Sequence, residues 1–490
     1  MANENSNKNK KLDAENYSDV FTSIEDDNEK YEKDLSYLRY LIDTKNINDL
    51  KVFVEDQKPV DIAYLINDMK SEKDIVFFFK TLPSDITAEI FSYLDADQQE
   101  KIVKAFTNKE VQEIIEKMAI DDIVDFVEEL PSNLVEKVIK ATSPEDRNIV
   151  NSLLNYKDDT AGSIMTTEYV TLRSELTARE AIKRIRKVGK DAETISTLFI
   201  IDSTRKLIGV LYLSDLIFAP ENQKITDIMN DDFLSVYSET DQEDVAKLIK
   251  KYDISVVPVV DKEHRIIGII TIDDIIDVIE SENTEDISKL AGVSPIETNY
   301  MKTSPWIIAK GRIPWLMILL FSGTFTGLIL SSFENALAVL PVLVAFIPVM
   351  MGTSGNAGSQ TNTVINRAMS LNQVTTHDYL KVLWKEFRVA LITGAIIATV
   401  NFFWVWFELR TGIINYTQTN GLSMVVVAFL VSLTMLIMIV VAKCLGCSLP
   451  IVAKRIHLDP ATVSGPAMST LLDITTLMVY FLLAKLILGI

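Results

Sequence analysis

The residues best suited to bind a ligand lie in an uncharged polar stretch of an otherwise apolar run. The sequence PVMMGTSGNAGSQTN, residues 348–362, follows AVLPVLVAFI and offers amide, hydroxyl and backbone oxygens without any charge. Non-helical backbone at membrane depth survives only where it is buried in protein or lines water. Glycines at 352, 355 and 358 would let such a backbone open. The stretch therefore predicts a break in a membrane helix at which a ligand approaches the backbone.

A single carboxylate is the second chemical feature of the apolar half. Asp473 lies near the middle of the apolar segment 461–484, and Ser469, Thr470 and Thr476 share its helix face. A carboxylate at the bilayer centre costs about 2.5–3.5 kcal/mol on insertion scales. Neutral oxygens with one carboxylate suit a hard cation, which favours a pore or a coupling-ion site. The structural alternatives are a packing kink of small residues and a protonated or hydrogen-bonded Asp473.

Five segments are long and apolar enough to hold these groups in a bilayer, since about 20 residues span the hydrocarbon. They are Pro314–Phe333, Asn335–Arg367, Val389–Phe407, Gly421–Ala442 and Ala461–Ala484. Lys and Arg concentrate in cytoplasmic loops. Here they precede the first segment and occupy the loops after the second and fourth, including Lys443, while the other two loops hold one and none. The bias predicts a cytoplasmic N-terminal half and an external C-terminus in a multi-pass protein of the cytoplasmic membrane.

Charge divides the chain into two halves. Residues 1–300 carry a net charge of −26 and residues 301–490 carry +6. This acidity argues against a nucleic-acid partner and is compatible either with bound cations or with solubility alone. The two cysteines, Cys444 and Cys447, lack the further ligands that zinc needs, so we interpret them as small membrane-helix residues. No catalytic constellation appears, and the protein is not expected to be an enzyme.

The acidic half divides further into helical and mixed parts. Residues 36–155 have the pattern of short amphipathic helices, in which LPSD at Leu82 and LPSN at Leu130 recur and Ser143 precedes Pro144 as a helix start. The predicted organisation is a disordered tail (1–35), an acidic all-α domain (36–155), an α/β domain pair (156–280), an acidic connecting helix (281–310) and a membrane domain of five helices (311–490).

Residues 160–280 contain a tandem repeat. SIMTTEYVTLRSELTAREAIKRIRK matches DIMNDDFLSVYSETDQEDVAKLIKK, and FIIDSTRKLIGVLYLSDLI matches VPVVDKEHRIIGIITIDDII. Each copy is predicted to form strand, helix, strand, turn, strand, helix. The repeat resembles a tandem CBS pair, a module that commonly dimerises and often binds adenine nucleotides. The ribose-binding pattern Ser/Thr-x-x-Asp is present at Thr271 and Asp274, but Tyr212 precedes Asp215 in the first copy, so ATP binding is left open.

The segment after the second copy is unusually acidic. Seven acids and no base lie between Asp273 and Asp286, and an apolar stripe predicts a helix. Further acids cluster at Asp121, Asp122 and Asp125 and at residues 239–244. One interpretation is a set of solvated faces. The other is that the clusters face each other across domains and hold divalent cations, for which Mg²⁺ fits better than Zn²⁺ because no His or Cys is near.

Together these features resemble the MgtE family of magnesium channels. The marks are TIDDIIDVIESENTEDISKLAGV, P-x-x-x-G-x-x-G-N-x-G-x-Q from Pro348 to Gln360, and DPATVSGPAMSTLLD from Asp459 to Asp473. The resemblance covers residues 36–490. Ser354 stands where the family usually has glycine, and Ser359 where asparagine is common. The resemblance implies a homodimer in the lipid membrane that moves hydrated Mg²⁺ and is closed by intracellular Mg²⁺.

The resemblance also implies site residues. Those of the pore would be Gly352, Gly355, Asn356, Ser359, Gln360 and Asp473. Those that bind regulatory Mg²⁺ would be Asp121, Asp125, Asp241, Glu243, Asp253, Asp274, Asp277, Glu282, Glu285 and Asp286. Two rival hypotheses remain: an ion-coupled secondary transporter or exporter that uses Asp473, and a nucleotide-sensing regulator with a membrane anchor.

Overall fold

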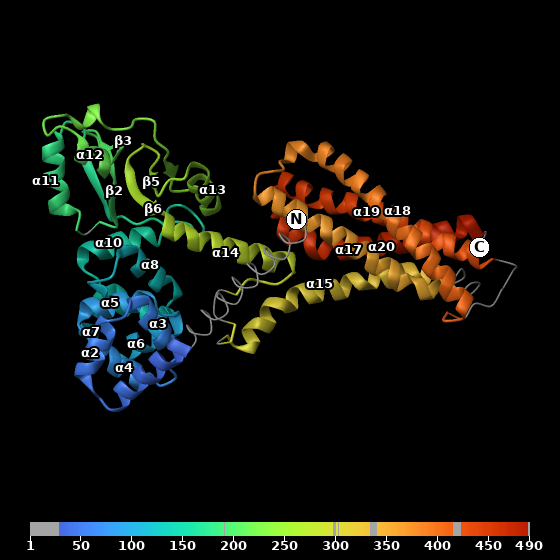
Figure 1. Ribbon diagram of the computed structural model, residues 1–490, viewed down its shortest axis with the longest axis horizontal. Helices are drawn as coiled ribbons and strands as arrows, with labels where there is room; N and C mark the ends of the chain where they lie inside the picture. The colour runs from blue at the N-terminus through green and yellow to red at the C-terminus, as the bar shows by residue number, and fades with distance from the viewer. Residues whose placement is uncertain are drawn as a thin grey trace, which may run out of the picture. The chain divides into compact units, whose positions relative to one another are not determined.

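The computed structural model describes residues 29–190, 192–296, 300–301, 303–333, 341–414 and 423–488. These residues fall into two compact units, Met1–Val278 and Ile279–Ile490, which Figure 1 colours from blue to green and from yellow to red. Residues 29–43 are helical, so the expectation of a disordered tail is wrong for residues 29–35. Residues 1–28 lie outside the described residues.

The first unit begins with short helices separated by tight junctions. After residues 29–43 come α2 (Ile47–Glu55), α3 (Pro59–Asn67), α4 (Glu72–Thr81), α5 (Ser84–Ser92), α6 (Ala96–Ala105), α7 (Asn108–Ile115), α8 (Ile120–Glu129), α9 (Ser132–Ala141) and α10 (Pro144–Leu153). The repeated Leu-Pro-Ser marks two of these junctions: Leu82 and Leu130 end α4 and α8, and a proline precedes the next helix. Ser143 caps α10 through the backbone N–H of Asp146, as predicted.

The tandem repeat forms two sheets of the same order. The first copy comprises β1 (Tyr169–Arg173), α11 (Ala178–Val188), β2 (Thr194–Ile201), β3 (Leu207–Tyr212) and α12 (Leu213–Phe218), and the 3₁₀ turn η1 (Ile225–Asp227) follows it. The second comprises β4 (Val236–Tyr237), α13 (Gln242–Tyr252), β5 (Val256–Val260) and β6 (Ile266–Thr271). In each sheet the first two strands are parallel and the last two antiparallel, which confirms the predicted order of elements.

The two copies interlock through a methionine and a glycine from each. A Cβ atom on Gly268 would come within 2.5 Å of the Met165 sulfur, and one on Gly209 within 2.9 Å of the Met229 sulfur. Backbone bridges join Thr166 to Ile269 and Val210 to Asn230 at the same places. Only glycine leaves room for these contacts, so each copy completes the packing of the other.

The acidic connecting helix differs in extent from the prediction. It is α14, Ile272–Leu290, which starts directly after β6 and ends well before residue 310. Ile272 N–H bonds to the Ser255 carbonyl. The helix therefore begins inside the region assigned to the CBS pair.

The second unit contains five helices long and apolar enough to cross a membrane among the described residues. They are α15 (Pro305–Ser332), α17 (Val342–Ser370), α18 (Tyr379–Thr411, after the 3₁₀ turn η2, Thr376–Asp378), α19 (Met424–Arg455) and α20 (Pro460–Leu488). α19 contributes the most buried residues, whereas α15 has none. The start predicted for the second span, residues 335–340, lies outside the described residues.

Candidate metal sites

The glycine-rich stretch is helical, so the predicted break is wrong. α17 runs without interruption from Val342 to Ser370, through the whole of residues 348–362. Inside a membrane every backbone group needs a partner from the chain itself, and the continuous helix supplies these partners except at Pro348, which has no N–H to donate. Glycine does lower helix stability relative to alanine, by about 1 kcal/mol in water, but breaking the ladder would leave several polar groups unpaired.

The uncharged polar residues of α17 divide between two faces. Gly352, Asn356, Ser359 and Gln360 are exposed and Gly355 is half-buried, whereas Ser354, Gly358 and Thr361 are buried. The exposed positions recur every three or four residues, so they form one continuous face. The residues predicted to line a pore on α17 thus lie together on a helix face that the described residues of this chain leave largely uncovered.

Two of the three glycines differ from the third in their surroundings. A Cβ atom on Gly352 or Gly355 would meet nothing within 4 Å, whereas one on Gly358 would come within 2.5 Å of the Leu472 side chain. Gly358 therefore serves close packing of α17 against α20, and the prediction that it opens the backbone to a ligand is wrong.

Asp473 is half-buried on α20 between two hydroxyl contacts. Thr470 Oγ1 lies 2.9 Å from Ser322 Oγ of α15, and Thr476 Oγ1 lies 2.8 Å from Ser354 Oγ of α17. The serine that departs from the family pattern, Ser354, thus joins two helices. Asp473 itself has no hydrogen bond or ion pair within the part of the chain that the structure describes. Its carboxylate oxygens remain available to an ion.

A buried lysine next to this region was missed by sequence reasoning. Lys443 was assigned to a loop, but α19 continues to Arg455 and leaves its side chain only 7% exposed. Its ammonium donates to Thr361 Oγ1 at 3.4 Å, and the Thr361 hydroxyl donates to Glu386 at 3.3 Å. This chain of bonds joins α17, α18 and α19 behind the exposed face of α17. Hydropathy alone could not find it, because it depends on how the helices pack.

In the first unit, the acids of α8 lie near others from the sheet and from the start of α14. Burial, followed by the charges of neighbouring acids, raises the pKa of Asp122 and of Asp125 to about 7. Burial likewise raises the pKa of Asp274 to about 6, with Asp121 among its neighbours. The pKa of Asp121 is also raised, chiefly by burial, and its Oδ1 atom is buried without a hydrogen bond in the described residues.

Two further members of this cluster were not predicted. Burial and the nearby Asp121 raise the pKa of Glu168 to about 7, and the same causes raise the pKa of Glu193. Each glutamate immediately precedes a strand, and β1 pairs with β2 in parallel, so the Glu193 N–H bonds to the Glu168 carbonyl at 2.8 Å. The strand register could have revealed the pair, but sequence spacing could not. We call Asp121, Asp122, Asp125, Glu168, Glu193 and Asp274 the acidic cluster.

The predicted regulatory acids of α13 have local structural roles. Asp241 caps the helix by accepting from the Glu243 N–H, and Glu243 pairs with Lys247 at 2.9 Å. Asp253 ends the same helix with φ of 52°. An 11-residue helix separates Asp241 from Asp253 by about 16 Å, so one ion cannot touch both within this chain.

The second half of α14 contacts the membrane helices and the residue before α20 within the second unit. Asp286 accepts from Ser370 Oγ at 3.3 Å, and Arg367 donates to Asn283 at 3.2 Å. Lys289 pairs with Glu285 at 2.6 Å and with Asp459, just before α20, at 3.1 Å. Asp277 and Glu282 also lie on this helix. Across the described residues, no group of three or more His, Cys, Asp or Glu side chains is arranged to hold a metal ion.

The residues considered for nucleotide binding differ in their surroundings. Thr271 Oγ1 donates to Asp274 Oδ2 at 2.7 Å at the start of α14, whereas Asp215 is exposed on α12. A ribose at Asp274 would have to share that carboxylate with Thr271.

Comparisons with protein families match three regions of the chain. Residues 347–483 match the MgtE divalent cation transporter family, residues 57–159 match the MgtE intracellular N domain, and residues 161–222 and 225–281 match CBS domains.

Individual proteins match over most of their length. The magnesium transporter MgtE of Thermus thermophilus is 34% identical, covering 90% of this chain and 95% of its own. The magnesium transporter MgtE of Bacillus subtilis is 30% identical, covering 93% and 97%. A crystal structure of the cytosolic domain of the Mg²⁺ channel MgtE in complex with ATP is 33% identical and covers 50% of this chain and 99% of its own, with a TM-score of 0.48.

Proposed function

This chain belongs to the MgtE family of magnesium transporters, and from that membership we propose that it is a Mg²⁺ channel whose pore lies between two copies. The observation that carries the proposal is the exposed face of α17, with Gly352, Asn356, Ser359 and Gln360. Polar groups at membrane depth face a bundle interior or water rather than lipid. A second copy, related by a two-fold axis, would enclose water between two such faces.

The side chains of this face suit a hydrated ion. Mg²⁺ dehydrates reluctantly and keeps several of its waters. Amide and hydroxyl groups can hydrogen-bond to those waters without removing them, and Gly352 and Gly355 leave room for the hydration shell because no atom lies within 4 Å of their Cβ positions. Asp473, with no partner of its own in the described part of the chain, would supply the charge that concentrates cations.

We also propose the orientation and the regulation of the channel. The distribution of Lys and Arg supports a cytoplasmic N-terminus and an external C-terminus. Intracellular Mg²⁺ would close the channel by neutralising Asp121, Asp125, Asp274 and the other acidic residues of the N domain, the CBS pair and α14. The raised pKa values of Asp122, Asp125 and Asp274 support this, since burial and, after it, the charges of neighbouring carboxylates make the ionised forms unfavourable, a cost that a bound cation would offset.

More than one ion is needed for such a switch. Moving an equilibrium from 1:99 to 99:1 takes about 5.5 kcal/mol of differential binding. One site occupied at about 100 times its Kd contributes about 2.7 kcal/mol. At least two Mg²⁺ sites per dimer must therefore act together, and closure should depend cooperatively on Mg²⁺.

Whether the CBS pair binds ATP is a separate question that an experiment on this chain can decide. Asp215 and Thr271 are the residues that would hold the ribose, and Thr271 is already bonded to Asp274. Calorimetric titration of ATP into the full-length wild type and into the Asp215→Asn variant tests this: binding by the wild type that the variant weakens would establish the nucleotide site.

Transport in reconstituted vesicles tests the main proposal. Proteoliposomes should take up Mg²⁺ in preference to Ca²⁺, Mn²⁺ and Co²⁺ when the protein is inserted, and patches should show unitary currents carried by Mg²⁺. Uptake that requires a Na⁺ or H⁺ gradient and gives no unitary current would instead establish the rival reading, a secondary transporter coupled through Asp473.

A further inference from the structure

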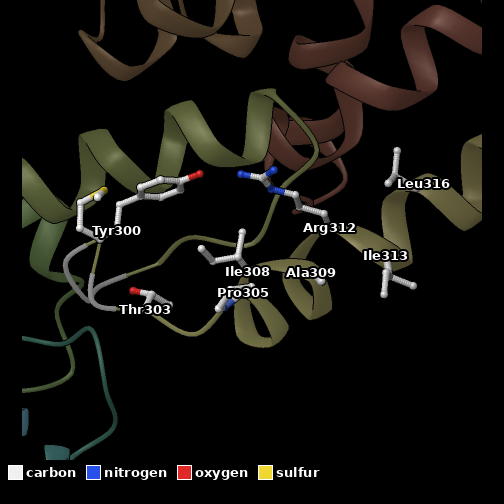
Figure 2. Close-up of a pocket in the computed structure, with 9 residues that line it drawn as sticks. Tyr300, Thr303, Pro305, Ile308, Ala309, Arg312, Ile313 and Leu316 are labelled. Carbon is white, nitrogen blue, oxygen red and sulfur yellow. The ribbon is translucent and has the colours of Figure 1, made fainter.

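A cavity of about 540 Å³ lies beside the first part of α15 and takes no part in the proposed pore. Its lining includes Tyr300, Ile308, Arg312, Ile313 and Leu316. Figure 2 shows the Tyr300 hydroxyl and the Arg312 guanidinium pointing toward one another on one side, with Ile313 and Leu316 further along the helix. The cavity thus has a polar end and an apolar end.

The polar end lies at the level of the lipid headgroups. α15 has 28 residues and is about 42 Å long, whereas the hydrocarbon is about 30 Å thick. Its uncharged run begins at Ile313, directly after Arg312. Arg312 therefore lies at the boundary between headgroups and hydrocarbon, and Leu316 lies about one turn deeper. Trp306, which is 78% exposed, lies on the headgroup side, where tryptophan is enriched.

The chain segment that lines the cavity is positively charged although the chain as a whole is acidic. Residues 301–318 contain three basic residues and no acid, in a chain with a net charge of −20. Lys310 and Arg312 are exposed, and neither has a carboxylate within 4.0 Å in the ranges that the structure describes. Both cations are therefore free to meet an external anion.

We propose that this cavity binds one anionic phospholipid of the cytoplasmic leaflet. The Arg312 guanidinium donates two hydrogen bonds to the phosphate, the geometry that arginine favours for phosphates, and the Tyr300 hydroxyl donates a third. One acyl chain lies along Ile313 and Leu316. Lys310 adds attraction to a second charge or to the surrounding anionic surface.

A lipid fits this cavity better than a second copy of the chain. A protein partner at this depth would need a carboxylate for Arg312. Residues 301–490 hold only six acids, and two of them, Asp378 and Asp459, are already paired with Lys381 and Lys289. The amphipathic lining, by contrast, matches the phosphate and acyl chain of one molecule.

Native mass spectrometry of the full-length protein tests the proposal. The protein in detergent is offered phosphatidylglycerol and phosphatidylcholine at equal concentration, and the wild type should retain phosphatidylglycerol in excess. One basic residue near an anionic surface contributes about 1 kcal/mol, which corresponds to about fivefold in affinity. Arg312→Gln should therefore weaken phosphatidylglycerol binding about fivefold and leave phosphatidylcholine unchanged, while Arg312→Lys should keep most of the preference.

Controls separate this site from general charge and from folding. Arg410→Gln removes an exposed arginine from the last turn of α18. This variant should retain phosphatidylglycerol and phosphatidylcholine in the same ratio as the wild type. Equal thermal stability of all variants in phosphatidylcholine shows that they fold, and if Arg312→Gln fails this check, Lys310→Gln replaces it. Inorganic phosphate should not displace the lipid, because it lacks the acyl chain.

Three results would overturn the proposal: an unchanged preference for phosphatidylglycerol in both Arg312→Gln and Lys310→Gln, displacement of the lipid by inorganic phosphate, or a disulfide between copies carrying Ile308→Cys that excludes the lipid. The last would identify the cavity as a contact between subunits. No arm of the experiment uses transport, so its outcome is independent of the channel proposal.

Discussion

Among single residues, Asp473 stands out because the hydroxyl groups near it on α20 are already hydrogen-bonded to other helices. Thr470 and Thr476, on either side of it along α20, already bond to Ser322 and Ser354. Those hydroxyls are therefore occupied in holding α15 and α17 to α20. The carboxylate of Asp473 lies between these two contacts along α20 and has no hydrogen-bond partner among the described residues.

We expect Asp473→Asn to lower Mg²⁺ uptake by about tenfold to a hundredfold in proteoliposomes. The change removes a charged acceptor whose interactions are worth about 1.5–3 kcal/mol, while its size and the two threonine contacts are kept. Glu408→Gln, near the end of α18, removes a carboxylate elsewhere in the same unit and should transport normally. Wild-type uptake by the Asp473 variant, with an unchanged oligomeric state, would exclude this residue from the pathway.

Among elements, α17 and α19 cross most closely at two glycines. A Cβ atom on Gly446 would lie 2.7 Å from the Gly358 carbonyl oxygen and 3.1 Å from the Thr361 side chain. The bonded chain from Lys443 through Thr361 to Glu386 lies beside this crossing. The crossing therefore determines which face of α17 remains exposed.

Gly446→Ala should destabilise the protein by about 1–3 kcal/mol, the usual effect of overpacking, because the contact is with backbone that cannot rotate away. Gly352→Ala is the matched control: it meets no atom within 4 Å and should raise helix stability by up to about 1 kcal/mol. Thermal unfolding in detergent measures both. Equal melting temperatures for the two variants would contradict the close crossing.

The end of α14 is joined to the membrane helices through Lys289. A double-mutant cycle of Lys289→Gln and Asp459→Asn should show a coupling of about 0.2–1 kcal/mol, the range for partly exposed pairs. Unfolding at low and high salt measures it, and the coupling should shrink as salt rises. Strict additivity of the two changes would mean that the 3.1 Å pair adds nothing to stability.

Over the whole molecule, the raised pKa values of the acidic cluster predict that compactness depends on pH as well as on the proposed binding of Mg²⁺. A carboxyl whose pKa is higher in the compact state binds protons more tightly there, so acidification favours that state. With pKa values of about 7 for Asp122, Asp125 and Glu168, the cost of burying these carboxylates near one another is fully present above about pH 7. It is lost as the pH falls toward about 4, the ordinary value.

Without Mg²⁺, spin labels at Tyr64→Cys and Val188→Cys should therefore give a narrower distance distribution at pH 5.5 than at pH 8.0. Both sites are exposed and lie in the first unit. Saturating Mg²⁺ should remove the pH effect, since the ion replaces the protons. Adding Asp122→Asn and Asp125→Asn should also flatten it. Identical distance distributions at both pH values in the wild type would contradict the claim that the ionised acidic cluster destabilises the compact state.

The repeat predicted both sheets correctly because the same positions recur in both copies: Gly209 and Gly268 lie in the last strand of each sheet, and Met165 and Met229 precede the first strand. The break in α17 could not be judged from glycine content, since propensities measured in water omit the need of membrane backbone for internal bonds. Glu168 and Glu193 escaped prediction because their proximity depends on strand register. Lys443 was placed in a loop because hydropathy ends a span at the first charge, whereas packing continued the helix.

The contacts between the methionines and glycines of the two copies can form only in a certain order during synthesis. Gly209 receives Met229 from a nearby part of the chain, but Met165 must wait for Gly268, which is made about 100 residues later. At about 5–20 residues per second, that interval is roughly 5–20 seconds. Met165 thus leaves the ribosome before its packing partner Gly268 is made, and Gly268 is itself made shortly before the first membrane helix, which starts at Pro305.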